Sequence, residues 1–78
     1  MNLFSRALID QVQRFAPFLR QHGFSVGTPE TLLALHVLSM IPLDDAELAM
    51  GTTRAVYAHN PAEWAAYPGL FRRHFSVA

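Results

Sequence analysis

Four histidines are the residues of this chain with the clearest capacity for acid–base or metal chemistry. They are His22, His36, His59 and His74. Typical zinc sites place histidines at a fixed helical spacing with a nearby carboxylate, and that pattern is absent from this sequence. His36 and Ser39 are spaced to form a nucleophilic pair, but no acid is placed to orient the imidazole. The sequence therefore predicts no catalytic residue, no metal site and no cofactor. For His36 it favours a partly buried imidazole hydrogen-bonded to backbone over a buried switch or a pair with Ser39, without fixing its role.

Asp44, Asp45 and Glu47 form the one acidic cluster. Paired carboxylates can serve acid–base or metal chemistry. Acids at the start of a helix also satisfy free N–H groups and favour the positive end of the helix dipole, which accounts for this cluster more simply. The chain has no lysine to complete a nucleotide-binding P-loop. We therefore interpret the cluster as a helix cap.

The composition restricts the function further. With six basic and six acidic residues among 78, the formal net charge is zero, which disfavours non-specific nucleic-acid binding. Absence of cysteine excludes disulfides and thiolate metal sites and favours the cytoplasm. The most apolar run, residues 32–41, is far shorter than the roughly 20 residues of a membrane-spanning helix, and the first residues lack the apolar core of a signal peptide. We expect a cytoplasmic protein that contacts neither membrane nor nucleic acid.

The elements that position these residues are predicted to be helices. One apolar stripe at helical spacing comprises Phe4, Leu8, Val12, Phe15 and Leu19. Pro17 predicts a kink or break late in this helix, and Gly23 ends it. Thr28 is the expected N-cap of a second helix, which Pro42 stops. Its side chains are apolar in nearly every direction, which predicts that this helix is the hub of the core.

Two more helices follow. Asp44 and Asp45 are expected to cap a third helix that ends near Ala58, and Asn60 with Glu63 to cap a fourth. The expected core side chains of the third helix are Leu48, Thr52, Ala55 and Val56. Pro68-Gly69 predicts that the fourth helix is divided into two short pieces. The sequence thus predicts one all-α domain over residues 1–78, a small compact bundle of about four helices joined by short loops.

Residues 18–35, 42–45, 57–64 and 71–75 carry a family resemblance. The first segment fits the pattern Leu-Arg, Gly, Val, Glu, Ala-Leu at fixed spacing over residues 19–35. Together these segments resemble the helical N-terminal region of the CoxE-like proteins that carry a von Willebrand factor A domain. The metal-binding Asp-x-Ser-x-Ser motif of that domain is absent, so this chain is expected to supply the helical part alone. A basic residue usual in the family is also missing near Tyr57-Ala58-His59.

The resemblance implies a non-catalytic, chaperone-like adaptor of the bacterial cytoplasm. Its expected partner is a MoxR-type AAA+ ATPase, a von Willebrand A domain protein or a client subunit, in client remodelling or metalloenzyme maturation. The residues expected to bind that partner are Trp64, Tyr67, Phe71, Arg72, Arg73, Phe24 and Val26. The surplus of aromatic residues also allows a homodimer. The alternative is a small helical DNA-binding or regulatory protein, against which the neutral charge argues.

Overall fold

The computed structural model describes residues 6–42 and 44–75, and Phe4 of the predicted first stripe lies outside these ranges. The described residues form four α-helices. Their bounds are α1 Arg6–Gln21, α2 Thr28–Leu38, α3 Ala46–Tyr57 and α4 Pro61–Phe75. The predicted all-α bundle is confirmed.

α1 continues through Pro17 without the predicted break. The proline removes the hydrogen bond to the Gln13 carbonyl, but both residues lie on the exposed face, where water can take up that carbonyl. The end of α1 is as expected. Gly23 has φ +90, its N–H donates to Arg20 O at 3.1 Å, and Phe24 N–H donates to Leu19 O at 3.1 Å, which is a Schellman motif.

α2 begins one residue earlier than predicted, because Gly27 and not Thr28 is its N-cap. Glycine has no side chain to cap the helix, but Glu30 makes the reciprocal bond of a capping box: its Oε1 accepts from Gly27 N–H at 2.8 Å. This hydrogen bond holds the pKa of the Glu30 carboxyl below its usual value. The Arg20 guanidinium donates to Val26 O at 3.0 Å and fixes the preceding loop to α1.

The prediction that α2 is the hub of the core is wrong. Only Ala34 and Leu38 of this helix are buried. Leu32 and Leu33 project outward, because α2 packs against α1 and α3 on one side and has no described neighbour on the other. The core is instead built around α1 and the faces of α3 and α4 that contact it.

α3 has the predicted cap, with Asp45 Oδ1 accepting from Leu48 N–H at 3.0 Å. Its inward face is rotated by about one residue from the prediction. The buried residues are Ala49, Thr53, Val56 and Tyr57, whereas Leu48 and Ala55 are exposed. Tyr57, which the helical spacing had not selected, fills the space next to Phe15 and thereby sets the rotation of α3.

α4 is one continuous helix, so the predicted division at Pro68-Gly69 is wrong. Asn60 caps it as expected: Asn60 Oδ1 accepts from Glu63 N–H at 2.8 Å. Glu63 reaches back to the N–H of His59 at 2.8 Å. Pro68 leaves the Trp64 carbonyl without its helical donor, and Arg54 Nε of α3 donates to that carbonyl at 2.9 Å. Because the Arg54 guanidinium satisfies the Trp64 carbonyl, α4 continues through Pro68.

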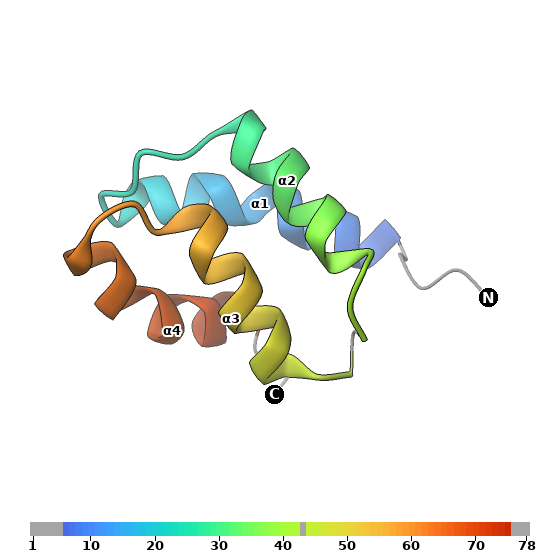
Figure 1. The fold of residues 1–78 in the computed structure, drawn as a ribbon. Helices are drawn as coiled ribbons and strands as arrows, with labels where there is room; N and C mark the ends of the chain where they lie inside the picture. The colour runs from blue at the N-terminus through green and yellow to red at the C-terminus, as the bar shows by residue number, and fades with distance from the viewer. Residues whose placement is uncertain (1–5, 43, 76–78) are drawn as a thin grey trace.

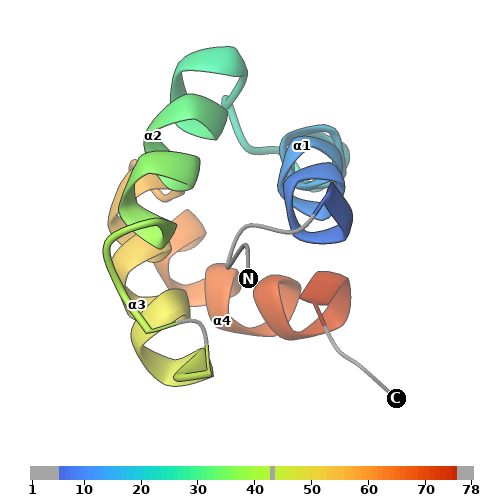
Figure 2. The same cartoon turned by 90° about the vertical axis from the view of Figure 1, so that its right-hand side faces the viewer.

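The helices form a closed cycle, since each packs against the next and α4 returns to α1. α2 and α3 form the front layer of Figure 1, and the view in Figure 2 shows α1 and the C-terminal part of α4 on the opposite side. Aromatic rings fill the centre. Phe15 of α1 lies with its ring centroid 5.1 Å from Tyr57, 5.8 Å from Tyr67 and 4.9 Å from Phe75. This set of rings, with Phe71, is named the aromatic core below.

Candidate functional site

Three of the four histidines hydrogen-bond to backbone carbonyls. His22 Nδ1–H donates to Phe18 O at 3.0 Å, His59 Nε2–H to Val56 O at 3.1 Å, and His74 Nε2–H to Gln11 O at 2.7 Å. His36 is exposed, and the Ser39 hydroxyl donates to the His36 backbone carbonyl at 2.6 Å, not to its ring. Ser39 and His36 therefore lack the hydroxyl–imidazole hydrogen bond that a Ser–His nucleophile requires.

Thr53, Tyr57 and Tyr67 place hydroxyls in the interior. Tyr67 Oη donates to Thr53 Oγ1 at 2.7 Å, and Thr53 Oγ1 donates to Ala49 O at 2.7 Å. Tyr57 Oη is the one buried side-chain polar atom without a hydrogen bond in the described part of the chain. The nearby Thr31 hydroxyl donates to Gly27 O instead.

Burial dominates the ionisation of both tyrosines. It raises the pKa of Tyr57 to about 12 and also raises the pKa of Tyr67. Neither phenol is accessible to a substrate, so both are structural.

The seven residues predicted to bind a partner divide by burial. Phe24, Val26 and Tyr67 lie in the core, and Phe71 packs against it. The other three, Trp64, Arg72 and Arg73, lie at the surface of α4. Only this second group is exposed at the surface of the folded domain.

Trp64 is 46% exposed and is held in a fixed position. The Arg54 guanidinium lies over its ring, with Cζ 4.2 Å from the ring centroid, while Arg54 Nε and Nη2 both bond to the Trp64 carbonyl. Sequence reasoning missed Arg54. The available signal was Pro68, four residues after Trp64, which predicts an unpaired carbonyl that a cation can take up.

The two C-terminal arginines of α4 have weak partners. Arg72 Nη2 lies 3.9 Å from Glu47 Oε1, with both side chains largely exposed. Arg73 lies above the Phe18 ring, with Cζ 5.8 Å from the ring centroid. Such exposed pairs contribute little to stability, so both cations remain available to an acidic group of a partner.

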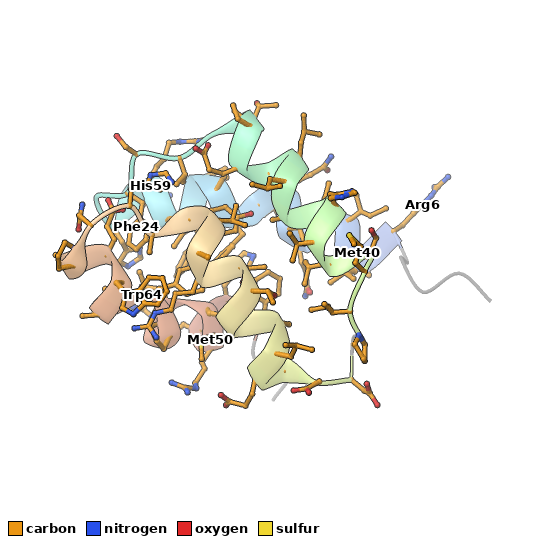
Figure 3. The ribbon with its side chains drawn as sticks, viewed as in Figure 1. Arg6, Phe24, Met40, Met50, His59 and Trp64 are labelled. Atoms are coloured by element: carbon orange, nitrogen blue, oxygen red, sulfur yellow. The ribbon has the colours of Figure 1, made fainter. Side chains whose placement is uncertain are left out.

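A second surface lies on the other layer and was not predicted. Exposed apolar side chains of α2, the turn after it and the start of α3 form what we name the α2–α3 face. Its members, with their exposed fractions, are Leu32 (61%), Leu33 (50%), Met40 (71%) and Leu48 (41%). His36 lies between the first three on the helical surface. In Figure 3, Met40 and Trp64 lie on opposite sides of the molecule, whereas Glu47, next to Leu48, lies 3.9 Å from Arg72 of α4.

Other kinds of site find no support in the described residues. Across residues 6–42 and 44–75, no group of three or more potential ligands is placed to hold a metal ion. The same residues contain no helix long and apolar enough to cross a membrane. A small apolar cavity of about 10 Å³ lies within the aromatic core, lined by residues such as Phe15, Leu38 and Tyr67. It is at the lower limit for one water molecule and offers no polar anchor.

Comparison with known proteins gives one match. A family model described as the CoxE N-terminal helical bundle domain covers residues 12–78. No curated protein and no solved structure matches the chain.

Proposed function

Since the chain belongs to the family of CoxE N-terminal helical bundle domains, we propose that it is a non-catalytic adaptor that docks a protein partner through the exposed side of α4. Its partner in this proposal is a MoxR-type AAA+ ATPase, a von Willebrand A domain protein or a client subunit. The complex would serve client remodelling or metalloenzyme maturation.

The stacked pair of Trp64 and Arg54 is the observation that carries this proposal. Tryptophan and arginine are the residue types most enriched among binding hot spots. Because Arg54 already holds the indole ring, little side-chain entropy remains to be lost on binding. Arg72 and Arg73, on the same helix, add positive charge that suits an acidic partner surface.

The chemistry of the described side chains is consistent with a docking role. Ser39 hydrogen-bonds to backbone, and His22, His59 and His74 do the same. The alternative of a DNA-binding protein gains no support, because α2 and the start of α3 carry acids and no arginine or lysine.

The test is co-purification of the tagged chain with a MoxR-type ATPase and a CoxE-like von Willebrand A domain protein. Trp64→Ala is expected to reduce recovery of the partner at least about tenfold, which is a typical hot-spot effect. Gln13→Ala shortens an exposed side chain of α1 that belongs to neither surface and is the control. Circular dichroism establishes that both variants remain helical. Full recovery with a folded Trp64→Ala variant would contradict the assignment of this surface.

A further inference from the structure

The α2–α3 face differs from the α4 surface in its charge. No arginine or lysine occurs between residues 21 and 53, and this segment contains four of the six acidic residues of the chain: Glu30, Asp44, Asp45 and Glu47. All six arginines lie outside it. A chain with zero net charge thus has an acidic segment that includes the α2–α3 face, and its arginines lie on α1, in the last turn of α3 and on α4.

The apolar side chains of this face are unlike ordinary surface residues. A small domain exposes scattered apolar side chains without consequence, but here four large ones lie on one layer. Burial of such a side chain against a partner is favourable because it removes apolar surface from water. Leu32 and Leu33 lie in the first half of α2 and Met40 in the turn that follows it, so the exposed apolar side chains extend along the length of this helix.

The surrounding charge decides which occupant fits. Nucleic acid and anionic membrane surfaces are repelled by carboxylates. A second copy packed symmetrically through the same face would bring the exposed carboxylates of Asp44 and Glu47 from both chains together, and the one cation that the described ion pairs place near them is Arg72, 3.9 Å from Glu47. An amphipathic helix that carries lysine or arginine beside its apolar stripe is complementary in both respects.

We propose that the α2–α3 face binds a basic amphipathic helix of another protein. The apolar stripe of that helix covers Leu32, Leu33 and Met40, and its cations lie toward Asp44 and Glu47. Asp44 and Glu47 are exposed, and the one ion pair between them and the described residues is the long contact of Glu47 with Arg72. This surface is independent of Trp64, so the inference stands or falls separately from the proposed function.

The test uses two model peptides of about 18 residues, five helical turns. The basic peptide has leucine at i, i+3, i+4 and i+7 with lysine at the other positions, and the acidic peptide replaces each lysine by glutamate. Binding to the isotope-labelled chain is measured by fluorescence anisotropy and by shifts of the α2 amide resonances. We expect the basic peptide to bind at least about tenfold more tightly than the acidic peptide at low salt, with the difference shrinking as salt is added.

Matched variants locate the site. The double variant Leu33→Ser with Met40→Ser is expected to weaken binding of the basic peptide about tenfold. Asp44→Asn with Glu47→Gln should weaken it several-fold and reduce its salt dependence. Asp10→Asn, an acid on α1 paired with Arg14 at 2.9 Å, and Trp64→Ala should leave it unchanged.

Four outcomes would overturn the proposal. They are equal binding of the two peptides, no binding of either, loss of binding in Trp64→Ala, and α2 resonances that shift with protein concentration alone. The last outcome would mean that a second copy occupies the face. Thermal unfolding of each variant verifies that the observed losses do not come from misfolding.

Discussion

The aromatic core and the α2–α3 face are both made of large apolar side chains, but those of the aromatic core are buried or partly buried and those of the α2–α3 face are exposed to solvent. Phe15 is 1% exposed and is surrounded by the rings of Tyr57, Tyr67 and Phe75, which belong to α3 and α4. Leu32, in contrast, is 61% exposed. Four helices in a cycle surround only the sides that point inward. The difference shows that an apolar residue type does not determine its own burial. The side of the helix on which it lies does, because each helix of the cycle has two neighbours and both pack on its inner side.

The strongest test of this comparison removes the central ring. Phe15→Ala is expected to destabilise the fold by about 3–5 kcal/mol, because it leaves a cavity among the rings that Phe15 touches. A domain of this size has a total stability of about 4–12 kcal/mol, so much of the variant is expected to be unfolded at room temperature. Urea unfolding followed by circular dichroism measures the loss. A change below about 1 kcal/mol would refute the central position of Phe15.

Alkaline pH probes the same core without mutation. Both buried tyrosines have folded-state pKa values above the unfolded value near 10. Their contribution to stability is therefore complete below about pH 10 and is lost as pH rises, up to about 1.4 kcal/mol per pH unit for each group. For Tyr57 the loss ends near its folded pKa of about 12.

Tyr57→Phe should accordingly reduce the alkaline loss, as measured by urea unfolding between pH 8 and about pH 11.5. At pH 8 it should leave stability unchanged or slightly raised, because Tyr57 Oη has no hydrogen bond. Tyr67→Phe serves as the comparison, since it removes the bond to Thr53 and should cost about 1 kcal/mol at pH 8. Identical behaviour of the two variants at pH 8 would contradict the hydroxyl assignments.

Two exposed glycines separate the effect of backbone conformation from that of packing, because an added Cβ meets no atom at either position. Gly23→Ala should destabilise by about 1–2 kcal/mol, because φ +90 at the end of α1 is unfavourable for a residue with a Cβ. Gly51→Ala, on the exposed side of α3, should stabilise by about 1 kcal/mol, because a Cβ there meets no atom and alanine favours a helix. Thermal midpoints of the two variants should move in opposite directions, and a shift of both in one direction would disprove this interpretation.

The smallest effect is expected on the α2–α3 face. Leu32→Ser should change the free energy of unfolding by no more than about 0.5 kcal/mol, since a side chain this exposed contributes little to the fold. Thermal unfolding beside Phe15→Ala makes the comparison directly. A loss of 2 kcal/mol or more would show that α2 is packed on a second side.

Prediction from the sequence succeeded where a signal is local. The Schellman end at Gly23, the Asp45 cap and the Asn60 cap each involve groups a few residues apart, so the residue types alone identify them. Prediction failed at Pro68. A proline removes the N–H that would bond to the carbonyl four residues earlier, and for this reason it was expected to end the helix. Here the Trp64 carbonyl instead accepts a hydrogen bond from Arg54 of α3, which the local sequence around Pro68 does not reveal.

The sequence by itself determined that this chain is a four-helix domain of the CoxE N-terminal family, because apolar periodicity, caps and family pattern are properties of neighbouring residues. Only the tertiary structure decided which apolar residues are inside. Phe24, Val26 and Tyr67 are buried and Leu32 and Leu33 are exposed, although all five are apolar or aromatic. Burial depends on the number of helices that surround a given face, and the closed cycle of this fold provides them on its inner side alone.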